Sequence, residues 1–484
     1  MKIAATDKDH FRDSLSTVDS AGKRVWLYPK KPSGKLYNAR NFVAYGLLAL
    51  LFAGPFLRIN GLPVLMLNVV ERKFIIFGGI FWPQDFFILL LAFLTLVVFI
   101  ILFTVIYGRI FCGWVCPQTI FMESVFRRIE YLFEGDFMKQ KALDKAPWDF
   151  EKIWRKGGKH LVFVLISFII ANTFLAYIIG SDELIRIMTD NPLNHLAGLG
   201  TLVVFTGIFY AVFAKFREQV CHIACPYGRL QGVMTDKNTI TIIYDYLRGE
   251  PRGKMRKNTE RTEGDCIDCN QCVQVCPMGI DIRNGTQLEC TNCTACIDAC
   301  DSIMDLIEKP RGLIRYDSEE NVATGSKFRI GGRIISYSIV LLILASALVT
   351  MLVIRDNIDA TILRTPGQMY QKTDHGTVTN LYNISLINKT QHEMPLTLKV
   401  ISPEGGKIKM VGSELVLPGQ GKTEGVFFIE IPQSVLKSIN SKIKIGVYSG
   451  DELLIEEKTK FLAPSGGATA KTITLTEDEA KEAI

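Results

Sequence analysis

Long uninterrupted runs of apolar residues occupy much of the first three quarters of the chain. Five of them are long enough for a helix to cross the hydrocarbon core of a bilayer, which takes about 20 residues. The most apolar run, FFILLLAFLTLVVFIILFTVIY, contains no charged residue, whereas a core helix of a soluble protein keeps polar side chains on its outer face. We therefore predict membrane-spanning helices at 41–57, 86–107, 161–180, 197–214 and 334–354.

Beyond the last of these runs, the chain changes to short stretches in which apolar and polar residues alternate. TEGVFFIEIP and SKIKIGVYS are two examples, and Gly, Pro, Asn and Ser separate the stretches. A period of two is typical of β-strands that bury one face. About seven such strands predict an immunoglobulin-like sandwich at 355–464. The small and polar residues 465–484 predict a disordered tail.

The formal net charge of +6 is modest and gives no reason to expect a nucleic-acid partner. Lysine and arginine gather before the first predicted span, between spans two and three, and between spans four and five. The positive-inside rule then places the N-terminal region in the cytoplasm, and five crossings put the C-terminal sandwich outside. All twelve cysteines fall on or near the cytoplasmic side, where thiols stay reduced and free to bind metals.

Eight of the twelve cysteines form two copies of one motif, Cys-x2-Cys-x2-Cys-x3-Cys, with a proline after the first copy. This spacing holds [4Fe–4S] clusters, and the fourth cysteine of each run binds the cluster of the other run. We therefore predict two clusters, the first held by Cys266, Cys269, Cys272 and Cys300, and the second by Cys290, Cys293, Cys296 and Cys276. Structural zinc gives no role to the third cysteine of each run, and disulfides need an oxidising compartment.

The other four cysteines form a second repeat. Cys112-x3-Cys116-Pro and Cys221-x3-Cys225-Pro each follow a predicted span, which indicates two duplicated helical hairpins. Cysteines four apart on a helix share a face, so we predict that each pair points two sulfurs the same way. Four converging thiolates would suit Cu(I), Zn or another iron–sulfur cluster. The alternative is that these cysteines are small apolar residues that pack between helices.

Two further polar residues accompany this second repeat. His222 lies inside the second pair and is either an additional ligand or a residue that packs or faces solvent. Arg109 precedes the first pair, and we expect it at the lipid headgroups, with compensation of thiolate charge as the alternative. No dinucleotide-binding glycine motif, Walker motif or haem-attachment motif occurs. Electrons are therefore expected from a partner, a quinol or a soluble donor.

Several long motifs of this chain resemble one family when they are taken together. RIFCGWVCPQTIF, CHIACPYGRLQ and CIDCNQCVQVCPMGIDIRNGTQLECTNCTACIDACD are similar to the cytochrome c oxidase accessory proteins called CcoG, FixG or RdxA. The resemblance implies a multi-pass protein of the bacterial inner membrane, with two cytoplasmic [4Fe–4S] clusters and a periplasmic immunoglobulin-like domain. It further implies a role in assembling a haem–copper cytochrome oxidase, in which Cu(II) is reduced to Cu(I) for delivery.

The expected fold is multi-domain, with a five-span α-helical membrane domain, a ferredoxin-like α+β domain and an all-β sandwich. Its expected parts are a cytoplasmic tail at 1–40, a four-span membrane domain at 41–232, a ferredoxin-type domain at 233–333, a fifth span at 334–354, the sandwich at 355–464 and the tail at 465–484.

The expected function is iron–sulfur electron transfer in oxidase assembly, with cupric reductase as the candidate enzyme activity. Oxidase subunits or copper chaperones are the expected partners, and the electron donor is not specified. Two alternatives stay open. One is a quinol-linked membrane ferredoxin of a respiratory chain, and the other is a non-catalytic assembly scaffold.

Overall fold

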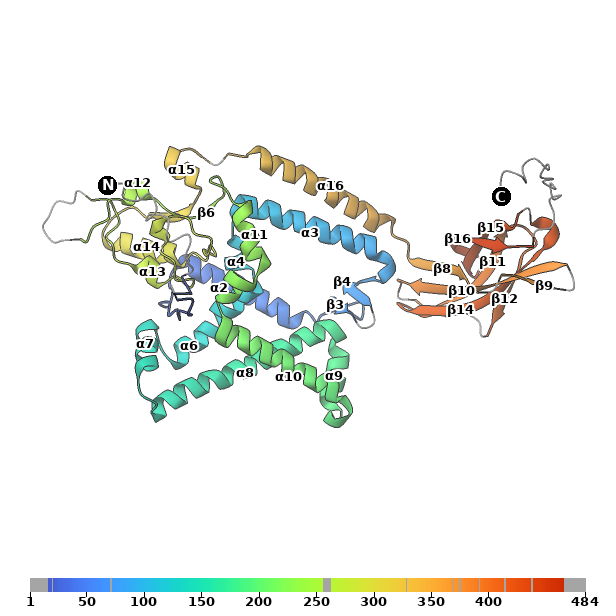
Figure 1. Cartoon of the computed structure of the whole chain (residues 1–484), viewed down its shortest axis with the longest axis horizontal. Helices are drawn as coiled ribbons and strands as arrows, with labels where there is room; N and C mark the ends of the chain where they lie inside the picture. The colour runs from blue at the N-terminus through green and yellow to red at the C-terminus, as the bar shows by residue number, and fades with distance from the viewer. Residues whose placement is uncertain are drawn as a thin grey trace, which may run out of the picture. The chain divides into compact units, whose positions relative to one another are not determined.

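The computed structural model describes residues 16–464 apart from 20, 70–71, 256–262, 328, 368, 374–375, 391, 413–414 and 437. The chain divides into two compact units, Met1–Gly78 with Trp82–Met351, and Gly79–Phe81 with Leu352–Ile484. The first unit contains most of the helices and all twelve cysteines, and the second is built mainly of strands (Figure 1). The predicted disordered tail lies outside the described residues.

The first unit is mainly helical. Its elements are α2 (Lys35–Ala53), β1 (Arg58–Ile59), β2 (Leu62–Pro63), β3 (Leu65–Asn68), β4 (Lys73–Ile76), η1 (Pro83–Asp85), α3 (Phe86–Tyr107), α4 (Ile110–Trp114), α5 (Pro117–Ile120), η2 (Phe121–Phe126), α6 (Arg127–Phe133), α7 (Phe137–Lys145), α8 (Phe150–Ile179), α9 (Ser181–Thr189), η3 (Pro192–His195), α10 (Leu196–Ala211), η4 (Val212–Phe216), η5 (Val220–Ala224), α11 (Pro226–Met234), β6 (Thr241–Tyr244), α12 (Tyr246–Gly249), α13 (Gln271–Gln274), η6 (Ile282–Asn284), α14 (Ala295–Leu306), β7 (Ile314–Asp317), α15 (Glu319–Thr324) and α16 (Gly332–Ile354).

Among the described residues, four helical segments are long and apolar enough to cross a membrane. They are Pro83–Tyr107, Phe150–Ile179, Leu196–Phe216 and Gly332–Ile354. Three of them contain the predicted spans 86–107, 197–214 and 334–354, and the fourth covers 161–180 except for its last residue. At most 6% of the apolar stretch is buried in three of these segments, and 33% is buried in Phe150–Ile179. The remaining predicted span, 41–57, is not among these four. Its residues lie in α2 and in the turn that follows it.

The helix α2 is tied to the ferredoxin-type segment at its first turn. Asp298 of α14 accepts hydrogen bonds from the backbone N–H groups of Leu36 (3.2 Å) and Tyr37 (2.7 Å). These N–H groups have no partner within the helix, so a carboxylate at this position stabilises the helix N-terminus. The chain thereby joins its first helix to a segment more than 250 residues away.

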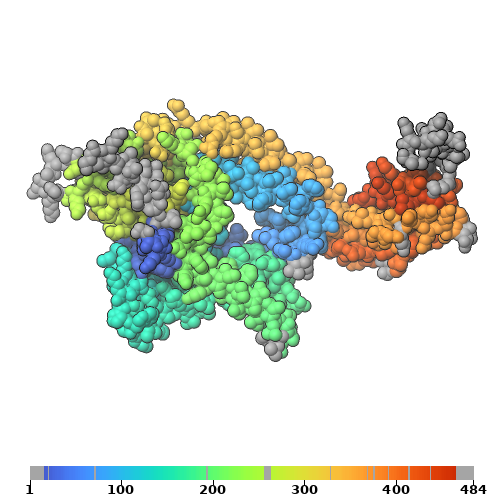
Figure 2. Space-filling view, viewed as in Figure 1, coloured from blue at the N-terminus to red at the C-terminus, as the bar shows by residue number. Residues whose placement is uncertain are grey.

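One hydrophobic core runs from the membrane helices into the ferredoxin-type segment. Phe126 stacks on Phe213 with ring centroids 4.5 Å apart, and Phe163 meets Phe126 edge-on at 4.8 Å. Cys266 and Cys272 belong to the same cluster of buried residues. In the space-filling view, the yellow-green surface of the ferredoxin-type segment is continuous with the green surface of α11 (Figure 2). The cysteine runs are therefore held against the helices rather than on a free-standing domain.

The two predicted hairpins end in the same backbone turn. Gly108, which follows α3, has φ 55° and ψ −126°, and Arg217, which follows η4, has φ 51° and ψ −123°. In each half, the second cysteine of the pair is extended, and the proline after it begins the next helix. This correspondence supports the predicted duplication.

The prediction that each cysteine pair lies on one helix face is wrong. Cys112 lies in α4 and Cys221 in η5, but Cys116 and Cys225 adopt extended conformations outside those helices. The cause is the following proline, whose ring disfavours a helical conformation of the residue before it.

The second unit is a sandwich of two antiparallel sheets. One sheet has the order β12-β14-β10-β8, with β9 beside β10, and the other has the order β13-β11-β15-β16. Its elements are β5 (Gly79–Phe81), β8 (Ile358–Arg364), β9 (Gln371–Lys372), β10 (Thr377–Asn388), β11 (Met394–Ser402), β12 (Lys407–Val411), β13 (Leu415–Leu417), β14 (Lys422–Pro432), η7 (Gln433–Val435), β15 (Asn440–Ser449) and β16 (Glu452–Leu462).

The alternation of residues along these strands matches their burial. In β14, Phe427, Ile429 and Ile431 are completely buried, and the residues between them are partly exposed. The quoted stretches TEGVFFIEIP and SKIKIGVYS fall in β14 and β15, so the predicted strands are confirmed there. The short strands β9 and β13 were not predicted, because two or three residues are too few to show a period.

A buried asparagine closes one end of the sandwich. The Asn388 Nδ2 group donates to the carbonyl oxygens of His392 (2.7 Å) and Pro418 (3.3 Å), and Oδ1 accepts from the Thr390 N–H (2.8 Å). We expect Asn388→Ala to lower the free energy of unfolding by about 2–4 kcal/mol, because the loss leaves buried backbone groups without partners. Urea unfolding of the separate domain 355–464 measures this change.

Asn383 on the same strand provides the control. Its side chain is exposed, so Asn383→Ala should change stability by less than about 0.5 kcal/mol. Equal effects of the two substitutions would contradict the structural role of Asn388.

Candidate functional site

Two small cavities in the ferredoxin-type segment are lined by cysteines. The first is lined by Cys266, Cys269, Cys272 and Cys300. The second is lined by Cys276, Cys290, Cys293 and Cys296, and Cys272 also borders it. The structure thus brings together both predicted sets, and in each set the fourth cysteine comes from the other run. Because Cys272 borders both cavities, the two sites are neighbours.

The two cysteine runs share the same turns. Asp268 and Asn292, which precede the second cysteine of their runs, have φ values of 53°, and Asn270 and Thr294, which follow it, have φ values of 57° and 67°. Alternating left- and right-handed residues turn several backbone N–H groups toward one side, which makes a concave site for an anion. The helices α13 and α14 begin directly after Asn270 and Thr294.

The buried thiols lie close together, so their ionised forms need a cationic partner. Burial raises the pKa of Cys272 to about 12, and burial together with the neighbouring Cys272 raises the pKa of Cys300 to about 12. Several such thiols ionise together only when positive charge lies among them. Each iron of a [4Fe–4S] cluster binds one thiolate and supplies that charge, so the donor set fits this group.

A single zinc ion fits these cysteines less well. Zinc needs four donors around one point. Within the described ranges, no three His, Cys, Asp or Glu side chains lie close enough to bind one metal ion. Thiolates around a cube bind separate irons and stand farther apart than the four donors of one zinc ion.

Arg283 braces the first run, and sequence reasoning did not identify it. Its guanidinium, only 7% exposed, forms ion pairs of 2.7 Å with both Asp268 and Asp281. It also donates to the Asn270 Oδ1 atom at 2.6 Å. The arginine therefore holds both left-handed residues of the first run, and its positive charge lowers the pKa of Cys272 against the effect of burial.

The second run is held by the membrane part of the chain. Gly113 in α4 lies so close that an added Cβ would be 2.4 Å from the Thr291 carbonyl oxygen and 3.0 Å from the Asn292 backbone. Arg40 of α2 donates to the Cys293 carbonyl at 3.0 Å. The first membrane cysteine motif and the second cysteine run are thus in direct backbone contact.

The four membrane cysteines lie near one another. Burial, and after it the charges of Cys116, Cys112 and Cys225, raise the pKa of the Cys221 thiol to about 12. Arg109 acts in the opposite direction on Cys112 and on Cys221. It is only 6% exposed, so the prediction that it lies at the lipid headgroups is wrong, and the alternative of charge compensation fits its position.

His222 is buried beside these thiols and does not face solvent. It is 9% exposed, and in the described part of the chain neither ring nitrogen has a hydrogen-bond partner. Burial and the charge of Arg109 lower its pKa to about 4, so the imidazole is neutral near pH 7, the form that binds metals.

Buried ion pairs position the second membrane motif. Arg217 binds the Glu130 carboxylate through two hydrogen bonds of 2.8 and 2.9 Å. Arg127 pairs with Glu123 at 2.6 Å and approaches Glu218 at 3.9 Å. All five side chains are at most 6% exposed. The network was not predicted, because its members come from segments about 90 residues apart.

Comparison with known proteins covers both cysteine groups. Family profiles described as "4Fe-4S binding domain" and "4Fe-4S dicluster domain" match residues 89–140 and 216–319, and one described as "IG-like fold at C-terminal of FixG" matches 348–464. Protein RdxB of Cereibacter sphaeroides is 33% identical over 397 residues, which cover 78% of this chain and 83% of RdxB. The chain belongs to the FixG/RdxA family.

Two further relatives agree with this assignment. Protein RdxA of the same organism is 32% identical over 81% of this chain and 85% of its own length. Nitrogen fixation protein FixG of Rhizobium meliloti is 29% identical over 81% of this chain and 82% of its own length. The predicted family resemblance is confirmed, together with 4Fe–4S-type domains and an immunoglobulin-like C-terminal domain.

Serine substitutions test which cysteines share a cluster. We expect Cys300→Ser and Cys269→Ser to perturb the same signal in the electron paramagnetic resonance spectrum of the reduced protein, because both residues line the first cavity. Cys276→Ser and Cys290→Ser should perturb the other signal. Pairing of Cys300 with Cys290 instead would show that each run holds its own cluster.

The contact at Gly113 gives a second prediction. Gly113→Ala pushes a methyl group against the Thr291 carbonyl, so the second run must shift, and we expect loss of about half of the bound iron. Gly46→Ala in α2 is the control, because its added Cβ has no neighbour within 4 Å. Iron and acid-labile sulfide analysis measures the loss, and full iron content in the Gly113 variant would contradict the role of this contact.

Proposed function

We propose that this protein is a membrane-bound iron–sulfur electron-transfer protein that reduces Cu(II) to Cu(I) at its membrane cysteines during cytochrome c oxidase assembly. The observation that carries the proposal is the backbone contact of Gly113 with Thr291 and Asn292. Gly113 follows Cys112, and the two other residues lie between Cys290 and Cys293. One residue therefore separates a candidate copper ligand from the wall of a cluster cavity.

The arrangement of the cysteines supports a direction for electron flow. Two [4Fe–4S] clusters, held by the two sets of four cysteines, would supply one-electron storage. Cys269 of the first set is exposed, whereas Cys293 of the second set is buried. The other cysteines of the two sets are buried or partly buried. Cys272 links the two cavities, and the second set lies next to α4.

The chemistry of copper supports the membrane cysteines as its site of reduction. Cu(I) prefers thiolates, and Cu(II) prefers nitrogen and oxygen ligands. A group of thiols therefore favours the reduced ion after one electron has been added to Cu(II). The buried, neutral His222 offers a nitrogen donor beside Cys221 for the ion that enters. The second membrane motif thus contains both donor types that a copper ion would use in its two oxidation states.

A five-span topology completes the proposal. Spans at 41–57, 86–107, 161–180, 197–214 and 334–354 would place both cysteine groups on the cytoplasmic side of the bacterial inner membrane, and the sandwich at 355–464 in the periplasm. The positive charges beside the spans support this orientation. We propose that the sandwich contacts oxidase subunits or copper chaperones, consistent with the FixG-like profile that it matches.

The membrane cysteines can be separated from the clusters by mutation. We expect Cys112→Ser and Cys225→Ser to slow Cu(II) reduction at least about tenfold, because a hydroxyl is a poor ligand for Cu(I). The cluster absorbance and iron content should stay unchanged. The assay mixes dithionite-reduced protein, freed of excess reductant, with Cu(II) and a Cu(I)-specific chelator.

Ala224→Ser is the matched control, because it introduces a hydroxyl next to Cys225 without removing a thiol. It should reduce Cu(II) at the rate of the unmodified protein. Unchanged rates in both cysteine variants would remove these residues from the reaction. Clusters that no physiological donor reduces would favour the scaffold alternative.

A further inference from the structure

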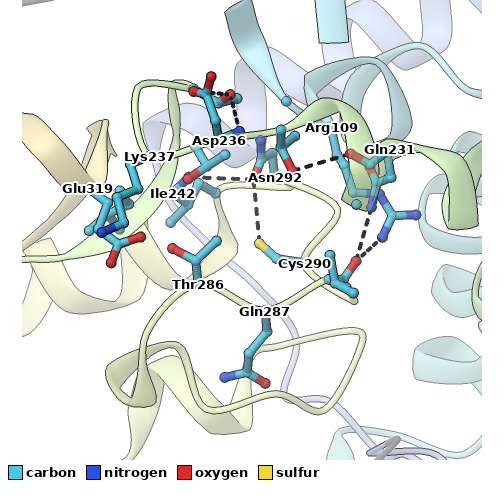
Figure 3. A pocket seen from close by; sticks show the side chains of 17 residues that line it. Arg109, Gln231, Asp236, Lys237, Ile242, Thr286, Gln287, Cys290, Asn292 and Glu319 are labelled. Atoms are coloured by element: carbon cyan, nitrogen blue, oxygen red, sulfur yellow. Dashed lines mark hydrogen bonds between the residues drawn. The ribbon is translucent and has the colours of Figure 1, made fainter. Parts of the chain in front are cut away.

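A cavity of about 350 Å³ lined by both polar and apolar groups lies beside the second cysteine set and has no role in the function proposed above. Its walls come from the end of α3, from α11, from β6 and from the turn that contains Cys290 (Figure 3). The volume falls in the range of small-molecule sites. The cavity therefore connects a membrane-span terminus directly with a predicted cluster ligand.

Three buried polar atoms of residues that line this cavity lack hydrogen-bond partners within the described part of the chain. They are Arg109 Nε, Gln231 Oε1 and Asn292 Nδ2. The three residues are 6%, 2% and 1% exposed. A buried polar group without a partner is costly, and such groups in a native structure need an explanation. The Arg109 and Asn292 atoms are donors and the Gln231 atom is an acceptor, and all three belong to residues that line the same cavity.

The opposite ends of these side chains are already fixed. Arg109 and Gln231 both donate to the Leu288 carbonyl, the latter at 3.2 Å. Asn292 Oδ1 accepts from the Ile242 N–H at 3.4 Å and lies 3.5 Å from the Cys290 sulfur. Figure 3 shows these bonds converging on the cavity wall. The free atoms are therefore held in place before a ligand arrives, and Asn292 would touch both the ligand and the cluster-binding sulfur.

The lining selects an uncharged ligand rich in oxygen. Arg109 and Lys237 are balanced by Asp236 and Glu319, so the walls carry no excess charge for an anion. The free donors need acceptor oxygens, and the free Gln231 oxygen needs a hydroxyl donor. The hydroxyl groups of a hydroquinone supply both functions.

The position of the cavity favours a lipid-borne molecule. Gly108 and Arg109 directly follow the apolar helix α3. Leu230, Val233 and Leu288, which are 55%, 83% and 60% exposed, form an apolar surface around the cavity residues Gln231 and Gly232. A nicotinamide or flavin nucleotide would need a phosphate-binding glycine motif, and the sequence has none.

We propose that this cavity binds the headgroup of a quinol, which is the electron donor of this protein. The inference rests on the electron-transfer role proposed above. Oxidation of one quinol to the quinone releases two electrons and two protons. The electrons go to the two one-electron [4Fe–4S] acceptors held by the cysteine sets, and the protons pass to water past the carboxylates of Asp236 and Glu319.

Replacement of Gln231 tests binding without disturbing a cysteine or the Asn292 turn. We expect Gln231→Leu to raise the dissociation constant of duroquinol at least about tenfold, because the acceptor for its hydroxyl group is lost. Anaerobic isothermal titration of the purified full-length protein measures this binding after reduction with dithionite, so that no electron transfer accompanies it. Anaerobic mixing with duroquinol should show slower bleaching of the iron–sulfur absorbance, with the same endpoint after dithionite.

Gln140→Leu is the matched control. Gln140 is also buried and also donates its amide to a backbone carbonyl, that of Gly135 at 2.9 Å, but it does not line the cavity. It should bind duroquinol as the unmodified protein does. Failure of the reduced unmodified protein to bind duroquinol saturably, or equal affinities in the two glutamine variants and the unmodified protein, would overturn the proposal.

Two further measurements distinguish a lipid-borne quinol from a soluble one, and the quinol proposal from the copper proposal. Decylubiquinol should bind more tightly than duroquinol if the apolar surface holds a lipid tail, and equal affinity would indicate a soluble quinol. Cu(II) reduction by dithionite-reduced Gln231→Leu protein should match the unmodified rate. If neither the unmodified protein nor the Gln231→Leu variant reduces Cu(II), the copper function is refuted, whatever the quinol titration shows.

Discussion

Direct packing of backbone against backbone links the two cysteine groups of this chain. Gly113 has no side chain, so α4 approaches the turn at Thr291 and Asn292 closely. Any larger residue would separate the membrane thiols from the second cavity by the thickness of its side chain. Arg40 and Asp298 add hydrogen bonds across the same boundary. This close contact and these hydrogen bonds together set the position of the membrane cysteines relative to the second cysteine run.

The two halves of the internal repeat share one backbone turn but have different residues in it. The turn after α3 has a positive φ at Gly108, which has no Cβ and adopts this conformation without strain. The equivalent turn after η4 has the same dihedral angles at Arg217, where a side chain costs of order 1–3 kcal/mol. The bidentate ion pair with Glu130 offsets this cost. The second half thus has a buried charge network at the turn where the first half has a glycine.

Hydrophobic pattern and cysteine spacing predicted the parts of this structure that depend on residues close together in the sequence. The uninterrupted apolar run at 86–107 coincides with α3, and the alternating stretches coincide with the main strands of the sandwich. Cysteine spacing predicted the two sets that line the cavities. The burial of Arg109 and the brace formed by Arg283 depend on contacts between distant segments, which no spacing encodes. The extended conformation of Cys116 was readable from Pro117, and the assumption of a continuous helix overlooked that signal.

The unequal exposure of the cysteines in the two sets affects the order in which oxygen would attack them. Cys269 of the first set is exposed, whereas every cysteine of the second set is buried or partly buried. Oxygen and peroxide attack accessible sulfur ligands first. Oxidation in air would therefore begin at Cys269 and reach the second set later.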